Sequence, residues 1–150
     1  MDMSHTLNVH VTGEWTKGVQ TRVHVRSFEP FIIDEPRALG GHDEGANPVE
    51  HILAGLTGCV SVMIAIIAKE QNFTYANASF DASGTLDVRG LMGTADVTPN
   101  FQTVTLHVTL ETEETDERLR ALEEAVESRC PVMTMLRDSG VRIDGAWTRA

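Results

Sequence analysis

The feature that most constrains the fold is a run of 17 residues, 52–68, without a charged side chain. Asn47, Pro48 and Glu50 precede it, and this combination of N-cap, first-turn proline and capping-box glutamate predicts a helix from about Pro48 to about Glu70. Its apolar residues leave no wide polar face. One domain of 150 residues rarely encloses a helix on all sides, so the pattern favours a helix buried at the interface of a homodimer.

A membrane span is the alternative interpretation of this helix. A span needs about 20 apolar residues, whereas this run has 17, is interrupted by Thr57, Gly58 and Ser61, and lacks aromatic belts. We therefore rank the interface helix above the membrane helix and expect no membrane partner.

Composition narrows the class of protein further. The 150 residues are 41% hydrophobic and 23% charged, which is typical of one soluble domain covering residues 1–150. A net charge of -10 is repelled by phosphate backbones, so we expect no nucleic-acid partner. The amino terminus lacks the basic stretch and apolar run of a signal peptide, which favours the cytoplasm.

Alternating apolar residues predict one antiparallel sheet before the long helix in the sequence and a second one after it. Residues 7–28 are expected to form a hairpin interrupted near Lys17–Gly18, and the Gly- and Pro-containing segment 34–45 an ordered loop. A second sheet is expected to contain strands at 78–82, 86–88 and 101–110, with a last edge strand at 141–147.

Two further helices are expected in the second half of the chain. Thr115 caps an amphipathic helix that ends just before Cys130–Pro131, because proline restricts the residue before it. Pro131 then begins a short helix to about Arg137, which Gly140 ends. The fold class is therefore α+β.

The chain has two cysteines, Cys59 and Cys130, whose spacing fits no CxxC or zinc signature. Cys59 lies inside the apolar helix, where a cysteine is usually a packing residue with little reactivity. Cys130 stands before Pro131 at a helix start, and the free N–H groups and helix dipole there predict a lowered pKa for its thiol.

The stretch from Gly45 to Cys59, GANPVEHILAGLTGC, followed some 70 residues later by Cys130-Pro131-Val132, resembles the OsmC/Ohr family of thiol-dependent hydroperoxide reductases. PRALGG at 36–41 and VRIDG at 141–145 extend the resemblance over nearly the whole chain. The resemblance implies an OsmC-like fold, with antiparallel sheets around a long buried central helix, and an intertwined homodimer with two active sites at its interface.

The same resemblance implies a chemistry for the two cysteines. Cys59 would attack an organic hydroperoxide and become a sulfenic acid, and Cys130 would resolve it as a disulfide. An external dithiol, of the lipoyl type, would then reduce the disulfide by exchange. No metal or organic cofactor is implied, and the biological role would be defence against oxidative stress.

One position departs from the family pattern. The residue after the Asn–Pro pair is Val49, where the well-characterised peroxidase branches have a glutamate that holds an arginine against the reactive thiolate. Glu50 is the nearest substitute, but on an ideal helix it lies about 180° and ~13 Å from Cys59. We therefore interpret Glu50 mainly as a capping residue, with catalysis as the minority alternative.

A buried thiol needs a nearby cation to ionise near neutral pH. Arg37, in the loop before the helix, and Arg22, in the hairpin, best match arginines of the family, and a solvated surface arginine is the alternative for each. Asp34, Glu35 or Asp43 could supply the missing carboxylate.

Other functions are compatible with the same residues. Val49 motivates a dimeric binding protein for small apolar or electrophilic ligands with little peroxidase activity. A weaker alternative is a purely structural dimer in which both cysteines only pack. The group His42-Asp43-Glu44 with His51 lacks a recognised ligand spacing, so we expect no metal.

Overall fold

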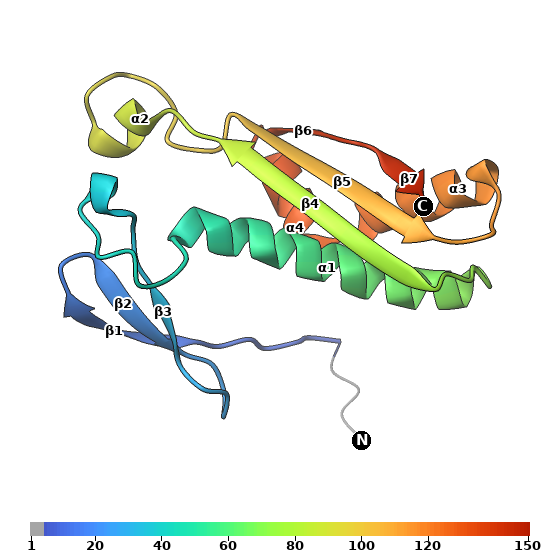
Figure 1. The fold of residues 1–150 in the computed structure, drawn as a ribbon, viewed down its shortest axis with the longest axis horizontal. Helices are drawn as coiled ribbons and strands as arrows, with labels where there is room; N and C mark the ends of the chain where they lie inside the picture. The colour runs from blue at the N-terminus through green and yellow to red at the C-terminus, as the bar shows by residue number, and fades with distance from the viewer. Residues whose placement is uncertain (1–4) are drawn as a thin grey trace. The chain divides into compact units, whose positions relative to one another are not determined.

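The computed structural model describes residues 5–150 (Figure 1), which divide into two compact units between His51 and Ile52. The elements follow in the order β1 (Thr12–Lys17), β2 (Gln20–His24), β3 (Phe31–Ile33), η1 (Arg37–Leu39), α1 (Pro48–Glu70), β4 (Asn77–Thr85), α2 (Val88–Met92), β5 (Thr103–Glu111), α3 (Asp116–Arg129), α4 (Pro131–Asp138), β6 (Arg142–Asp144) and β7 (Trp147–Arg149). The chain is α+β, which confirms the predicted fold class.

The first unit contains a three-stranded antiparallel sheet in the order β1-β2-β3. Its hairpin turns at Gly18, whose φ of 51° lies in the left-handed region that favours glycine. The Trp15 indole N–H donates to the Gly18 carbonyl at 2.8 Å and closes the turn. The predicted hairpin and its interruption near Lys17–Gly18 are confirmed.

The expected start of the first strand at residue 7 is wrong. β1 begins at Thr12, whose partner is His24, the last residue of β2. The chain then turns through Arg26, which has a φ of 49°. The ladder between β1 and β2 therefore starts at Thr12, and the alternating side chains of Leu7, Val9 and Val11 are exposed.

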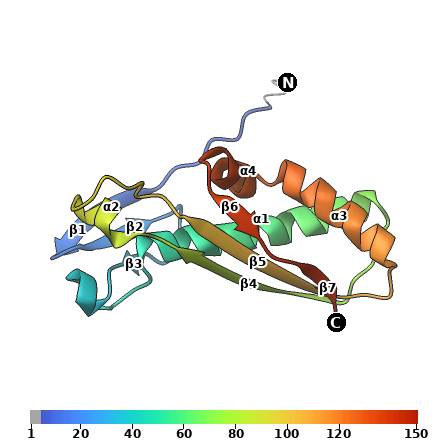
Figure 2. The same ribbon diagram turned by 90° about the horizontal axis from the view of Figure 1, so that it is seen from above.

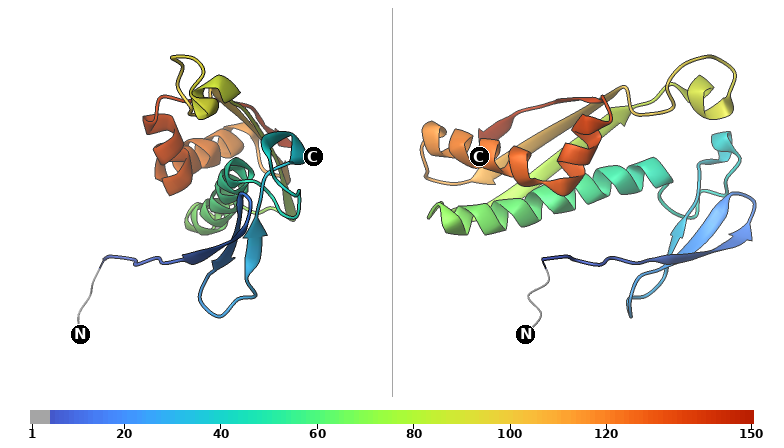
Figure 3. Two further views of the ribbon diagram at one scale, coloured as in Figure 1. Left: turned by 90° about the vertical axis from the view of Figure 1, so that its left-hand side faces the viewer. Right: turned by 180° about the vertical axis from the view of Figure 1, so that it is seen from behind.

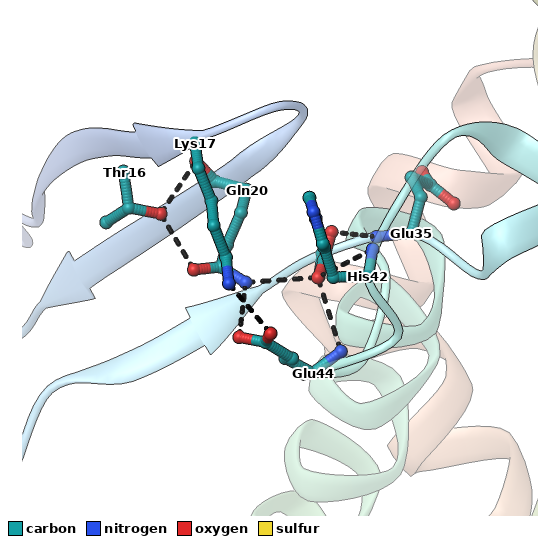
Figure 4. Close-up of polar contacts among 7 residues, drawn as sticks. Thr16, Lys17, Gln20, Glu35, His42 and Glu44 are labelled. Atoms are coloured by element: carbon teal, nitrogen blue, oxygen red, sulfur yellow. Dashed lines mark hydrogen bonds and ion pairs between the residues drawn. The ribbon is translucent and has the colours of Figure 1, made fainter.

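A buried carboxylate organises the loop between β3 and α1. Asp34 accepts hydrogen bonds from the Gln20 side chain and from the backbone N–H groups of Glu35, His42 and Glu44. Figure 4 shows how these contacts tie the hairpin to the loop, with Lys17 reaching the Glu44 carboxylate. Burial alone would raise the pKa of Asp34, but the hydrogen bonds lower it to about 2. This carboxylate is therefore fully used in holding the loop.

The start of α1 follows the predicted capping box. The Glu50 backbone N–H donates to Asn47 Oδ1 at 2.8 Å, and the Asn47 N–H donates to Glu50 Oε1 at 2.9 Å. The predicted helix span is also confirmed, because α1 runs from Pro48 to Glu70. By length and composition alone, α1 is apolar enough to cross a membrane.

The second unit is a four-stranded mixed sheet with helices on one face. β4 pairs antiparallel with β5, and the short strands β6 and β7 pair parallel with the other edge of β5. Figures 2 and 3 show α1, α3 and α4 on the same face of this sheet. The buried core is made of apolar side chains from β5, α1 and α3: Val104, Leu106, Val108, Leu110, Leu56, Val60, Ile64, Ile67, Leu119, Leu122 and Val126.

The strand expected at residues 86–88 is wrong. Asp87 instead accepts a hydrogen bond from the Arg89 backbone N–H at 3.0 Å and caps α2, which ends at Gly93 with a φ of 69°. A local side-chain cap thus outweighs the apolar alternation of Leu86 and Val88.

The single edge strand expected at 141–147 is interrupted. It forms β6 and β7, separated by Gly145 and Ala146. Gly145 has a φ of 135°, and a Cβ there would lie 1.8 Å from the Leu106 carbonyl oxygen. This close approach allows Ala146 to accept a hydrogen bond from the Val108 N–H at 3.0 Å.

Gly145→Ala is expected to destabilise the protein more than Gly140→Ala. Gly140 also has a positive φ, 93°, but open space around its missing Cβ, so its substitution costs only strain of about 1–2 kcal/mol. Gly145→Ala adds a clash with backbone and should cost about 3 kcal/mol or more. Urea unfolding of both variants measures the difference in their free energies of unfolding. Equal losses of stability would contradict the close backbone approach at Gly145 as the reason for the interruption between β6 and β7.

Candidate active site

Cys59 lies in the middle of α1 and is half-buried. Its neighbours Leu56 and Val60 are completely buried, whereas Gly55 and Gly58 have open space where a Cβ would stand. Cys59 therefore sits at the border between the buried and the open sides of the helix.

Cys130 lies at the junction of α3 and α4 and has no exposed surface. Its φ of -76° and ψ of 115° are extended, as expected for a residue before proline. Its backbone N–H still donates to the Val126 carbonyl at 2.9 Å, so Cys130 closes α3 while Pro131 opens α4. The predicted end of α3 and start of α4 are confirmed.

The structure brings the two thiols together. Cys130 Sγ donates a hydrogen bond to Cys59 Sγ, and the two sulfurs are 2.8 Å apart although 71 positions separate the residues. Both cysteines are free thiols. The direction of the hydrogen bond makes Cys130 the proton donor and Cys59 the acceptor.

The lowered pKa expected for Cys130 is wrong. Burial first, and then the hydrogen bond to Cys59, raise the pKa of Cys130 to about 11. The backbone N–H groups of Met133 and Val132 do act at this sulfur and lower its pKa, as a helix start should. Removal of the thiol from water is the stronger effect, so Cys130 stays protonated.

The other predicted site residues, Arg22, Arg37 and Glu50, belong to the first unit. Arg22 is on β2, half-exposed, with its guanidinium 3.7 Å from Glu14. Arg37 begins η1 and is exposed. Glu50 is engaged in the capping box with Asn47. The thiol pair is thus the part of the predicted site that the second unit assembles by itself.

Three acidic residues of the first unit were expected as possible supports for an activating arginine. Asp34 is committed to the loop, whereas Glu35 has a buried Oε2 without a hydrogen-bond partner among residues 5–150. Burial raises the pKa of Glu35, and the charges of Glu50 and Asp34 raise it further. Asp43 has a positive φ of 57°.

A metal site was not expected from the sequence. Among residues 5–150, no group of three or more His, Cys, Asp and Glu side chains is placed so that it could hold a metal ion.

The sequence analysis missed two features, one in each unit. In the first unit, the His51 Nε2 atom is buried without a hydrogen-bond partner in the described part of the chain, and the His51 ring lies 5.2 Å from that of Phe31. The sequence signal was the position of His51 in the first turn of α1, one residue after the capping glutamate. The burial of Cys130 had no local signal, because α3, α4 and the sheet create it together.

A mixed α+β unit that holds two free thiols in contact, one on a long apolar helix and one at a helix start, defines the class of the protein. The family model described as OsmC-like protein matches residues 41–144. The chain therefore belongs to the OsmC-like family. A comparison with curated proteins gave no match.

Solved structures share this fold over almost their whole length. An OsmC-like protein from Mycoplasma pneumoniae is similar with a TM-score of 0.83 and 17% identity, covering 100% of this chain and 99% of that one. An organic hydroperoxide resistance protein OsmC from Legionella pneumophila has a TM-score of 0.73 and 19% identity, covering 98% and 99%. An organic hydroperoxide resistance protein from Elizabethkingia anophelis has a TM-score of 0.73 and 21% identity, covering 99% of each.

Cys130 is expected to titrate only at strongly alkaline pH. In a Cys59→Ala variant, burial still raises the pKa of Cys130 above the ordinary value of 9.0, and the loss of the hydrogen-bond acceptor at position 59 should bring it below about 11. The raised pKa of the wild-type thiol means that the folded state holds this proton more tightly than the unfolded state. The contribution of this thiol to the free energy of unfolding is therefore fully present below about pH 9 and is lost as the pH rises through about 11. Thiolate absorbance at 240 nm measures the titration, and a midpoint below pH 9 would contradict the role of burial.

Proposed function

We propose that this protein is a thiol-dependent peroxidase that reduces organic hydroperoxides in oxidative stress defence. The observation that carries the proposal is the contact of 2.8 Å between Cys59 Sγ and Cys130 Sγ. Cys59 is the more accessible thiol and accepts the hydrogen bond, as suits a nucleophile, and Cys130 is the buried, protonated partner. Membership of the OsmC-like family supports the same assignment.

The proposed reaction has two steps at the thiol pair. The Cys59 thiolate attacks the peroxide oxygen, the O–O bond breaks, and the leaving alkoxide takes a proton to become an alcohol. Cys130 then loses its proton and attacks the resulting sulfenic acid, which forms the Cys59–Cys130 disulfide and releases water. The sulfurs are already in contact, so the second step needs only a small movement of the side chains.

An external dithiol of the lipoyl type completes the proposed cycle by reducing the disulfide. The cytoplasm suits this cycle, because its thiol pool keeps cysteines reduced. The reaction uses the two sulfurs and needs neither a metal nor an organic cofactor.

A dimeric binding protein for small apolar or electrophilic ligands is the second candidate function. Val49 favours it, since this position lacks the carboxylate that would hold an arginine against Cys59. Glu50 is no free substitute, because both its backbone N–H and its carboxylate bond to Asn47. The reactivity of Cys59 at neutral pH therefore distinguishes the two functions.

The proposed site lies in a homodimer. Ile52, Val62 and Ile66 are exposed on α1, with exposed fractions of 43%, 57% and 45%. Gly55 and Gly58 cost helix stability, and the open space beside them leaves room for another backbone to approach closely. A second copy of the chain would cover this face.

One equivalent of cumene hydroperoxide is expected to consume both thiols and join Cys59 to Cys130 in an intramolecular disulfide. In Cys130→Ser the oxidation should stop at a Cys59 sulfenic acid that dimedone traps, whereas Cys59→Ser should remain unmodified. Mass spectrometry of the three proteins measures this. Two free thiols in the treated wild type, or modification of Cys130 alone, would overturn the peroxidase assignment.

Arg37→Ala or Arg22→Ala is expected to slow the alkylation of Cys59 at pH 7. Loss of the cation that stabilises the thiolate should lower the rate about tenfold, which corresponds to about 1.4 kcal/mol. The measurement uses a Cys130→Ser background, with Arg26→Ala as the control, since Arg26 stacks on Phe28 at 4.6 Å. If Cys59 is alkylated as slowly in the Cys130→Ser parent protein as in the arginine variants made from it, the binding function replaces the catalytic one.

Val62→Asp is expected to convert the dimer into a monomer. An aspartate on the apolar face of α1 would bury an unpaired charge in the interface. Val88→Asp is the matched control, because Val88 is similarly exposed, at 53%, but lies on α2. Sedimentation velocity at micromolar concentration measures both variants, and a wild-type monomer would overturn the dimer.

A further inference from the structure

The two sulfurs of the thiol pair differ in their access to solvent. Cys130 has no exposed surface, whereas Cys59 is only half-buried. The sulfurs are already 2.8 Å apart, so forming the disulfide moves each side chain little and leaves Cys130 enclosed by the same residues. An oxidised pair therefore presents one of its sulfurs to solvent.

We propose that the reductant attacks the Sγ atom of Cys59, so that Cys130 is the leaving group and the mixed disulfide forms on Cys59. This inference rests on the proposed function, because it concerns the disulfide that the peroxidase reaction produces. It assigns the two cysteines their order in the reductive half of the cycle.

Access and leaving-group strength favour different sulfurs here. Burial, the larger cause, raises the pKa of Cys130, and a thiol with a high pKa leaves slowly. Exchange nevertheless requires the attacking thiolate to reach a sulfur directly. Cys130 offers no surface for that approach, so access decides the site of attack.

The start of α4 assists the departure of Cys130. The backbone N–H groups of Val132 and Met133 donate to its sulfur and lower its pKa. As the bond to Cys59 breaks, negative charge develops on Cys130 Sγ, and these two donors stabilise it. The leaving sulfur therefore departs into a prepared hydrogen-bonding environment, although burial keeps the step slower than for an exposed thiol.

The electrons and protons balance with a dithiol reductant. One thiolate of the reductant bonds to Cys59 Sγ, the Cys59–Cys130 bond breaks, and its electron pair passes to Cys130, which takes a proton. The second thiol of the reductant loses its proton and attacks the reductant's own sulfur in the mixed disulfide, which releases the Cys59 thiolate. The dithiol leaves as a cyclic disulfide, and two electrons have reduced both cysteines.

The test identifies which cysteine carries the mixed disulfide. The full-length protein is oxidised with diamide, freed of reagent, treated briefly with the monothiol N-acetylcysteine, and quenched with N-ethylmaleimide. Trypsin places Cys59 and Cys130 on separate peptides, residues 38–69 and 130–137. We expect N-acetylcysteine on Cys59 and maleimide on Cys130, in at least about tenfold excess over the reverse pattern. An adduct mainly on Cys130, or equally on both, overturns the inference.

A second measurement does not depend on trapping the mixed disulfide. The single-thiol variants Cys130→Ser and Cys59→Ser are reacted with 4,4′-dithiodipyridine, with circular dichroism as the check of folding. The native Cys59 thiol should react at least about tenfold faster than the native Cys130 thiol, and urea should remove the difference. Equal native rates overturn the inference.

The two proposals fail in different ways. Diamide forms the disulfide without a peroxide, so the site of attack is measured whether or not the protein is a peroxidase. If hydroperoxide leaves both thiols free while the diamide-formed disulfide is attacked at Cys59, the proposed function fails and the order of exchange stands. If hydroperoxide forms the disulfide and the adduct appears on Cys130, the function stands and the order fails.

Discussion

The contact between the two thiols depends on the interruption of a helix at Pro131. Proline has no N–H to continue α3, and it disfavours a helical conformation at the residue before it. Cys130 consequently adopts an extended backbone and turns the chain from α3 into α4, with hydrogen bonds from its N–H to Val126 and to its carbonyl from Thr134. The same turn points its thiol into the core, against Cys59 on α1. If α3 continued as a regular helix through residue 130, the Cys130 side chain would point in a different direction and would lose its contact with Cys59.

Burial then assigns different properties to two identical side chains. Cys130 is completely enclosed, which raises its pKa, while Cys59 remains accessible at the edge of the core. The donors at the start of α4 oppose the effect of burial but are outweighed by it. This difference in burial explains how two identical thiols could take separate tasks in the proposed redox cycle.

Local signals predicted much of this architecture. The capping residues Asn47 and Thr115 and the break at Pro131 mark helix boundaries within a few residues of themselves, and the structure confirms all three. The errors arose where the outcome depends on distant partners. Leu7 has the alternation of a strand but no strand opposite it, and the raised pKa of Cys130 comes from a core built by segments far apart in the chain. The pairing of Cys59 with Cys130 followed from a family resemblance, because nothing local relates residues 71 positions apart.

The causes of the raised pKa of Cys130 have different lifetimes in the proposed cycle. Burial is permanent, but the charge interaction exists only while Cys59 is a thiolate. When Cys59 becomes a neutral sulfenic acid in the proposed cycle, this charge interaction is lost, whereas the N–H groups of Val132 and Met133 still stabilise a Cys130 thiolate. The pKa of Cys130 is therefore expected to fall at the stage when its nucleophilicity is needed. Before that stage the proton on Cys130 supplies the hydrogen bond to Cys59, so a single contact both supports the attacking sulfur and restrains the resolving one.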